Sequence, residues 1–167
     1  MPAIRLRFVL HNDVVSQGMV LYQKTSMPFT PGHVECVMPD GRYLGMHFKD
    51  PAGMQYREPG YDAGEISILP DKRLAEIFVD LPATQVQVDG FHAAAIASIG
   101  EPYDIAAFIE YALPIHAHSY NHAVCSAKMF LLLRKIGWFK WPITVPAHCL
   151  TPRDLLMVLS THIEIKH

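Results

Sequence analysis

The sequence predicts a domain of the α+β class. A strand and a β-hairpin are expected early in the chain, and a series of helical segments follows them. Half of the residues are hydrophobic and 18% are charged, a balance that supports a sizeable core and argues against disorder. The length of 167 residues suits one domain, and no internal repeat, linker or low-complexity segment divides it. We therefore expect a single domain over residues 1–167.

Charge and cysteine content argue against several classes of protein. The net charge is -2 and no basic run is present, so we expect no nucleic-acid partner. The three cysteines, Cys36, Cys125 and Cys149, have no CxxC spacing and suit a reducing compartment. The N-terminus lacks the apolar stretch of a signal peptide, and the longest apolar run, Met129–Leu133, is too short to span a bilayer. We expect a cytoplasmic protein without stable membrane insertion.

The first elements lead into a loop. Residues Ile4–Leu10 read as a strand, and Asp13 is a plausible N-cap for a short helix over Val14–Lys24. Two prolines and Gly32 then break the chain.

The clearest hairpin of the sequence follows this loop. Strands over His33–Met38 and Arg42–Phe48 flank Pro39-Asp40-Gly41, which suits a type I turn followed by a left-handed glycine. The turn sets the facing pairs: Met38 with Arg42, Val37 with Tyr43, Glu35 with Gly45, and His33 with His47. By alternation His33, Glu35 and His47 then share one face, whereas a slip of one residue would move His47 to the other.

The remaining elements are expected in the second part of the chain. We predict a long loop over Pro51–Pro70, a strand over Ala75–Val79, and helices over Pro82–Ile99 and Ile105–Ala112. The central helix is expected over Ala123–Ile136, followed by an extended aromatic segment over Trp138–Pro146 and a final helix over Thr151–Ser160. Thr151 is an N-cap, with proline in the first turn and Asp154 reaching back to it. The helix that begins near Cys125 is apolar almost all round, so it should lie in the middle of the domain.

Cys125 is the candidate nucleophile. At the start of a helix, unpaired N–H groups and the helix dipole favour a thiolate. An imidazole beside the thiol can take its proton, and His33 on the hairpin is the candidate base. A third polar group must orient that imidazole, and Glu35 and His47 lie on the same face.

The order of these motifs resembles the circularly permuted papain-like hydrolases, which comprise permuted NlpC-type cysteine peptidases and lecithin:retinol acyltransferase-like enzymes. The matching pieces span most of the chain: Gly32-His33-Val34-Glu35, Asp40-Gly41, Val124-Cys125-Ser126-Ala127 and Leu150-Thr151-Pro152-Arg153-Asp154-Leu155-Leu156. Within that group, the segment His33–Gly45 together with Tyr56-Arg57 and Tyr103-Asp104 is similar to small proteins common in bacteriophage genomes.

The resemblance implies a permuted papain-like fold, with a small antiparallel sheet packed against the helix that starts at Cys125. It implies Cys125 as nucleophile and His33 as base, with the N–H of Cys125 contributing to an oxyanion hole. The third position stays open. Many relatives carry a polar residue where His47 stands, whereas the phage-like relatives share the position of Glu35. Residues i and i+2 of a strand are spaced about 6.6 Å, which favours His47.

Other candidate groups receive plainer interpretations. Cys36 should point into the opposite face and pack there, and nothing nearby organises Cys149 as a second nucleophile. The spacing of His116, His118 and His122 could suit zinc, but no carboxylate or further thiolate stands at a conventional distance. These three histidines are interpreted as surface or cleft residues. We expect no metal and no cofactor.

The sequence therefore predicts a cysteine hydrolase that cleaves an amide or ester through an acyl-enzyme. The resemblance implies a peptide-like or acyl small-molecule substrate, with bacterial cell-wall peptides as one class. Two alternatives stay open. One is lipid or thioester acyl transfer on the same scaffold, and the other is a catalytically idle phage assembly or binding protein.

Overall fold

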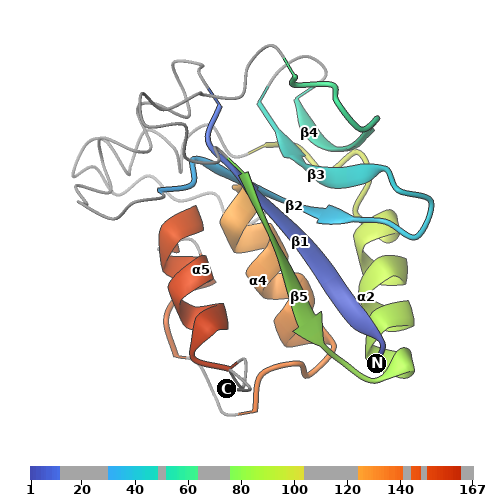
Figure 1. Cartoon of the computed structure of the whole chain (residues 1–167), viewed down its shortest axis with the longest axis vertical. Coiled ribbons are helices and arrows are strands. Elements are labelled where there is room, and N and C mark those ends of the chain that lie inside the picture. Colours follow the sequence, from blue (N-terminus) through green and yellow to red (C-terminus); the bar gives the residue numbers. More distant parts are fainter. Residues whose placement is uncertain are drawn as a thin grey trace.

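Five antiparallel strands form one sheet in the order β4-β3-β2-β1-β5 (Figure 1). The computed structural model describes residues 1–11, 30–48, 52–63, 76–103, 124–140, 144–147 and 150–162. The strand bounds are Ala3–Val9 for β1, His33–Val37 for β2, Tyr43–His47 for β3, Gly53–Arg57 for β4 and Glu76–Pro82 for β5. The first strand lies in the interior of the sheet because it pairs with both β2 and β5.

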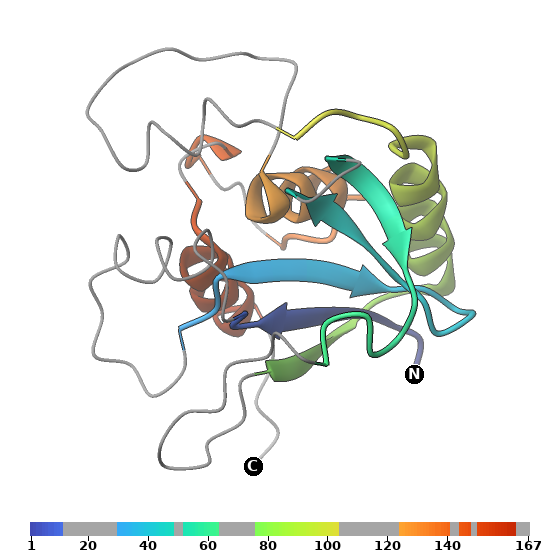
Figure 2. The same ribbon diagram turned by 90° about the horizontal axis from the view of Figure 1, so that it is seen from above.

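The helix that begins at Cys125 is the central helix of the described structure. The helix bounds are Gln85–Ala97 for α2, Cys125–Lys135 for α4 and Pro152–Ser160 for α5. Helix α4 packs against β2 and β3 and contacts both α2 and α5. Figure 2 shows α2 and α4 on the same side of β1 and β2. The α+β class is thus confirmed, with an antiparallel sheet packed against α4.

Alternation along the strands separates the hydrophobic core from a polar face. Leu6 and Phe8 of β1, Cys36 of β2 and Leu44 of β3 are fully buried in one hydrophobic cluster, which also includes Phe130 of α4. The residues between them on β1 and β2 include charged and imidazole side chains that are also buried. Since successive side chains of a strand point to opposite faces, these polar groups lie away from that cluster.

The predicted hairpin register is confirmed where the strands are paired. Val37 faces Tyr43 and Cys36 faces Leu44. The N–H of Gly41 donates to the carbonyl of Met38, and Gly41 has φ of 86°, as the expected left-handed glycine requires. The rings of His33 and His47 lie with centroids 5.0 Å apart, so the two histidines face each other.

Helix ends follow local signals in the sequence. Thr84 begins α2 and Thr151 begins α5, each with a reciprocal capping box formed with the residue three positions later. Gly100 and Gly137 follow α2 and α4 with positive φ, which matches their expected role as stops. Helix α4 differs at its start, because its N-cap Val124 offers no side-chain hydrogen bond.

Two segments differ from the prediction. The Gly- and Pro-rich stretch after position 51 was expected to be a loop with short extended pieces, but β4 forms a full partner of β3. The aromatic segment after α4 is not an extended strand in its described parts. Instead Trp138 follows the helix in a turn, and its indole N–H donates to the carbonyl of Pro82. Trp138 and Phe139 pack edge to face, as the packing interpretation requires.

Several predicted features lie outside the described residues. These are the helices over Val14–Lys24 and Ile105–Ala112, the three histidines His116, His118 and His122, and Asp104 and Cys149. Among the helices that the structure describes, none is long and apolar enough to cross a membrane.

Gly45 provides a test of how closely β3 approaches β2. A Cβ atom at Gly45 would lie 2.7 Å from Cβ of Glu35, whereas one at Gly90 in α2 would meet only Ile136, at 3.5 Å. We expect Gly45→Ala to lower the free energy of unfolding by about 1–3 kcal/mol through overpacking. The control Gly90→Ala should raise it by about 0.5–1 kcal/mol, since alanine favours a helix interior. Chemical denaturation measures both, and equal effects would contradict the close approach at Gly45.

Candidate functional site

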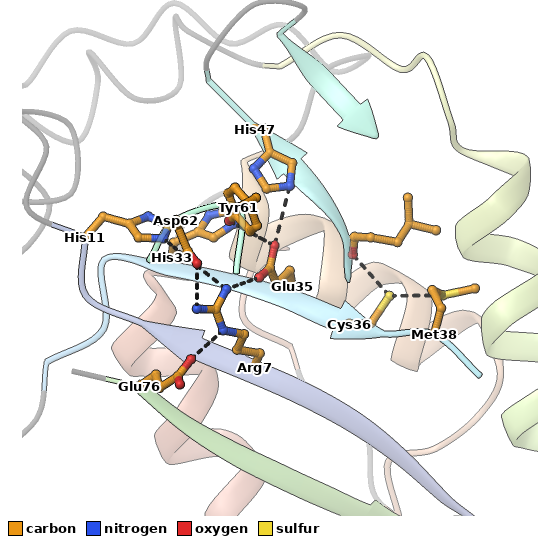
Figure 3. Close-up of polar contacts among 11 residues, drawn as sticks. Arg7, His11, His33, Glu35, Cys36, Met38, His47, Tyr61, Asp62 and Glu76 are labelled. Carbon is orange, nitrogen blue, oxygen red and sulfur yellow. Dashed lines mark hydrogen bonds and ion pairs between the residues drawn. The ribbon is translucent and has the colours of Figure 1, made fainter. Parts of the chain in front are cut away.

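Glu35 lies at the centre of a buried polar cluster (Figure 3). Its side chain is fully buried on β2. Nη1 of Arg7 donates to Oε1 at 2.6 Å, and the Tyr61 hydroxyl donates to Oε2 at 3.3 Å. Oε2 also lies 3.6 Å from Nε2 of His33 and 3.5 Å from Nε2 of His47. One carboxylate therefore connects β1 and both histidines of the hairpin.

Arg7 holds this carboxylate from the neighbouring strand. Its side chain is only 2% exposed, and it reaches three carboxylates. Besides Glu35, its Nε donates to Glu76 at 2.7 Å and its Nη2 donates to Asp62 at 3.1 Å. The guanidinium also lies over the ring of Tyr43, with 4.6 Å between its central carbon and the ring centroid. Such a fork of bound donors leaves Arg7 little freedom to rotate.

Asp62 and His11 extend the cluster toward His33. Nε2 of His11 lies 2.5 Å from Oδ2 of Asp62, and the His11 ring stacks on the His33 ring at 5.6 Å. Hydrogen bonds from His11 and Arg7 outweigh burial and lower the pKa of Asp62 well below its usual value. The turn that follows β4 thus supplies both Tyr61 and Asp62, and encloses the carboxylate of Glu35 from a third direction.

His33 joins the cluster to Cys125. Burial alone would lower the pKa of His33, but the charge and hydrogen bond of Cys125 and the contact with Glu35 outweigh it and raise the pKa to about 10. His33 is the first residue of β2 and Cys125 is the first residue of α4. Both are buried, with Cys125 only 2% exposed. The imidazole is therefore influenced by both the thiol of Cys125 and the carboxylate of Glu35.

His47 occupies a different environment from His33 although their rings are adjacent. Burial, and then the positive charge of His33, lower the pKa of His47 to about 3. Its imidazole is thus uncharged at neutral pH. It faces Glu35 through Nε2 and packs edge to face on Tyr61 at 5.5 Å. His47 faces the same carboxylate oxygen as His33, and burial, which would raise the pKa of Glu35, is outweighed by the two histidines and Arg7, which lower it.

The other described cysteine is placed for packing. Cys36 is fully buried in the hydrophobic cluster, with its sulfur 3.1 Å from the carbonyl oxygen of Leu44. Burial raises the pKa of this thiol far above its ordinary value. The prediction that Cys36 points away from His33 is consistent with this position. Tyr103 is buried too, and it packs edge to face on Phe48.

The start of α4 is anchored without a capping side chain. The hydroxyl of Ser126 donates to the carbonyl of Leu150 at 2.5 Å, which connects α4 to the segment before α5. Val124, the N-cap, makes no side-chain hydrogen bond. The first N–H groups of α4, next to the sulfur of Cys125, are therefore not occupied by a capping side chain.

Sequence reasoning identified part of this arrangement. His33, Glu35, His47 and Cys125 were all named as site residues, and the structure brings the first three together and places Cys125 against His33. Glu35 and His47 both stayed open as the partner of His33, and both lie near its ring, with His47 at 5.0 Å between ring centroids. The Cα atoms of residues i and i+2 are far apart, but the two long side chains converge to 3.6 Å.

Four members of the cluster were missed. They are Arg7, His11, Tyr61 and Asp62. A signal existed for Arg7, which is the single charge in the otherwise apolar stretch from Leu6 to Leu10. Asp62 and Tyr61 lie in a stretch rich in glycine and proline, where nothing local indicates burial. Their position depends on the pairing of β4 with β3.

The three hairpin residues also form a potential metal site. One ligand atom each from His33, Glu35 and His47 lies within 4.8 Å of the others, and all three residues are buried. Imidazole nitrogen and carboxylate oxygen are common ligands of zinc and related ions.

Comparisons with known proteins add no name to this arrangement. A search against protein-family models and a search of curated proteins both find no match for the chain. The contacts of the site itself are therefore the basis for inferring a function.

Replacing Arg7 tests whether the cluster is held from β1. We expect Arg7→Met to lower the free energy of unfolding by about 3–5 kcal/mol, because it leaves buried carboxylates without their partner. Arg5 on the same strand pairs with Asp80 but is about half exposed. The control Arg5→Met should therefore change stability little. Urea denaturation of both variants measures the difference, and similar losses would show that burial of Arg7 has no special role.

Proposed function

We propose that the protein is a cysteine hydrolase in which Cys125 is the nucleophile and His33 is its base. The observation that carries the proposal is the position of the His33 ring, 3.6 Å from the carboxylate of Glu35 and close enough to Cys125 for that thiol to raise the pKa of the ring. A thiol, an imidazole and an orienting carboxylate are the three groups that nucleophilic thiol catalysis requires. The imidazole and the carboxylate come from β2 of the hairpin and the thiol comes from the start of α4, while Arg7 of β1 holds the carboxylate.

The two nitrogens of His33 have separate tasks in this proposal. Nε2 is directed at Glu35, so Nδ1 is left to exchange the proton with Cys125. His33 takes the thiol proton, and the Cys125 sulfur attacks the carbonyl carbon of an amide or ester. The developing negative charge on the carbonyl oxygen is bound by N–H groups at the start of α4, which lack a capping side chain. His33 then gives its proton to the leaving amine or alcohol.

The second half of the reaction uses the same imidazole. His33 removes a proton from a water molecule, whose oxygen attacks the acyl carbon bound to Cys125. The carbon–sulfur bond breaks, the acid product leaves, and the proton returns to the thiol. Glu35 stabilises the imidazolium form and is itself held ionised by Arg7. We assign Glu35 the orienting role because its Oε2 faces Nε2 of His33. Nε2 of His47 lies 3.5 Å from the same oxygen.

The permuted papain-like fold is part of the same proposal. It is supported by the order of the elements, with a histidine strand and its hairpin before the cysteine helix, and by the packing of α4 on β2 and β3. Within this proposal a peptide-like amide is the substrate class, with bacterial cell-wall peptides as one example. Acyl transfer from a lipid or thioester would use the same acyl-enzyme with an acceptor other than water.

Selective alkylation tests the nucleophile and its base. Metal-free protein is treated with limiting iodoacetamide near neutral pH, and labelled cysteines are mapped by mass spectrometry. We expect Cys125 to react faster than Cys36, because burial raises the pKa of the Cys36 thiol. His33→Ala should slow labelling of Cys125 by about tenfold or more. The matched control is His92→Ala on α2, where the histidine contacts the backbone of Val37.

The same experiment can contradict the proposal. Equal labelling of Cys125 in the wild type and in His33→Ala would show that His33 does not activate the thiol. Thermal unfolding of each variant separates a lost activation from a lost fold, since a locally unfolded protein would expose and label Cys36 as well.

A further inference from the structure

Three side-chain atoms of the hairpin are spaced as the ligands of a small metal ion are spaced. Nε2 of His33 and Nε2 of His47 lie 3.6 and 3.5 Å from Oε2 of Glu35. Zinc binds nitrogen and oxygen ligands at about 2.0–2.2 Å in tetrahedral geometry, which places neighbouring ligand atoms about 3.4 Å apart. These two nitrogen–oxygen separations are longer than an ordinary hydrogen bond and close to this ligand spacing, and one ligand atom from each of the three residues lies within 4.8 Å of the others.

The two ring nitrogens that face the carboxylate lack hydrogen-bond partners. Among the described residues, Nε2 of His33 and Nε2 of His47 are buried and make no hydrogen bond. Both residues are more than nine-tenths buried, at 8% and 6% exposed. Burying a polar atom without a partner is costly, and native structures usually supply one. A cation between the two rings and Oε2 would satisfy both nitrogens at once.

The charge of the surrounding cluster favours a divalent cation. Glu35, Asp62 and Glu76 bring three negative charges around Arg7, which brings one positive charge. Arg57, whose positive charge also acts on His47, adds a second positive charge, so an excess of one negative charge remains. Oε1 of Glu35 and the Asp62 oxygens are occupied by Arg7 and His11, and Oε2 of Glu35 is the oxygen that remains directed at the histidines.

We propose that His33, Glu35 and His47 form a binding site for one divalent transition-metal ion of the zinc class. Two imidazole nitrogens and one carboxylate oxygen are the ligands, and a fourth position is open. Arg7 orients the carboxylate from behind, as an outer partner of a metal ligand does. The hairpin register creates the site, since only this register places both histidines beside Glu35.

Metal binding has a consequence for Cys125 that depends on the proposed hydrolase function. An ion on Nε2 of His33 uses the lone pair of that nitrogen, so the proton of the neutral ring must stay on Nδ1. The ring then cannot accept the proton of Cys125. Metal binding and thiol activation therefore exclude each other, and zinc acts as an inhibitor of the hydrolase.

Direct binding measurements test the site. Chelator-treated full-length protein is titrated with Zn²⁺ against a chromophoric competitor, and Co²⁺ is added separately to record its visible spectrum. We expect one ion per chain in the wild type, with a Co²⁺ spectrum of four- or five-coordinate geometry. His47→Gln keeps a polar side chain beside Glu35 but removes a ligand, and should weaken binding by at least about tenfold. His92→Gln makes the same change on α2 and should bind as the wild type does.

A second variant, checked for folding, distinguishes loss of a metal ligand from loss of the fold. His33→Gln should weaken Zn²⁺ binding as His47→Gln does, and thermal unfolding checks that each variant is folded. Wild-type protein that binds no Zn²⁺ at micromolar concentrations would overturn the site. So would folded His33→Gln and His47→Gln variants that both bind as tightly as the wild type.

Labelling of Cys125 distinguishes failure of the site from failure of the hydrolase proposal. Zinc should slow alkylation of Cys125 in the wild type and should have little effect in His47→Gln. If zinc binds at the hairpin but metal-free labelling does not depend on His33, the metal site stands and the hydrolase proposal fails. If labelling depends on His33 but no zinc binds, the metal site fails and the hydrolase proposal stands.

Discussion

The buried ion pair between Arg7 and Glu35 is the interaction on which the arrangement of the site depends. The two side chains come from adjacent strands, are almost fully buried, and meet at 2.6 Å. Removing two charges from water is expensive, so such a pair persists only where further hydrogen bonds satisfy the remaining atoms. Here Asp62 and Glu76 occupy the other donors of Arg7, while Tyr61 and the two histidines surround the second oxygen of Glu35. The pairing of β1 with β2 therefore determines where Oε2 of Glu35 lies.

That oxygen faces two imidazoles in unequal environments. His33 also contacts Cys125 and favours its charged form, whereas burial and the neighbouring charge keep His47 neutral. Strongly shifted pKa values that arise from burial and a specific charged neighbour cluster at functional sites. The carboxylate can orient the base of a thiol, and together with both rings it can hold a metal ion. The geometry supports both chemistries, and the two cannot operate at the same time.

The sequence predicted the local parts of this structure well. The hairpin register, the capping box at Thr151 and the start of α4 near Cys125 each follow from residues within a few positions of one another. The roles of Arg7 and Asp62 could not be predicted in this way. They depend on β1 pairing between β2 and β5 and on the turn after β4 folding over the sheet, which are contacts between distant segments. The choice between Glu35 and His47 as the partner of His33 could not be made from backbone spacing, because it depends on the reach of the glutamate side chain.

The charge state of the His33 ring tests the central claim most directly. Nitrogen-15 NMR of histidine-labelled, metal-free protein at about pH 8 distinguishes a ring with two protons from a neutral ring, and free histidine is neutral at that pH. With its pKa raised to about 10 by Cys125 and Glu35 against the effect of burial, His33 should carry two ring protons in the wild type. Its proton should be lost at lower pH in Cys125→Ala. A neutral His33 ring in the wild type, or the same behaviour in Cys125→Ala, would contradict the account.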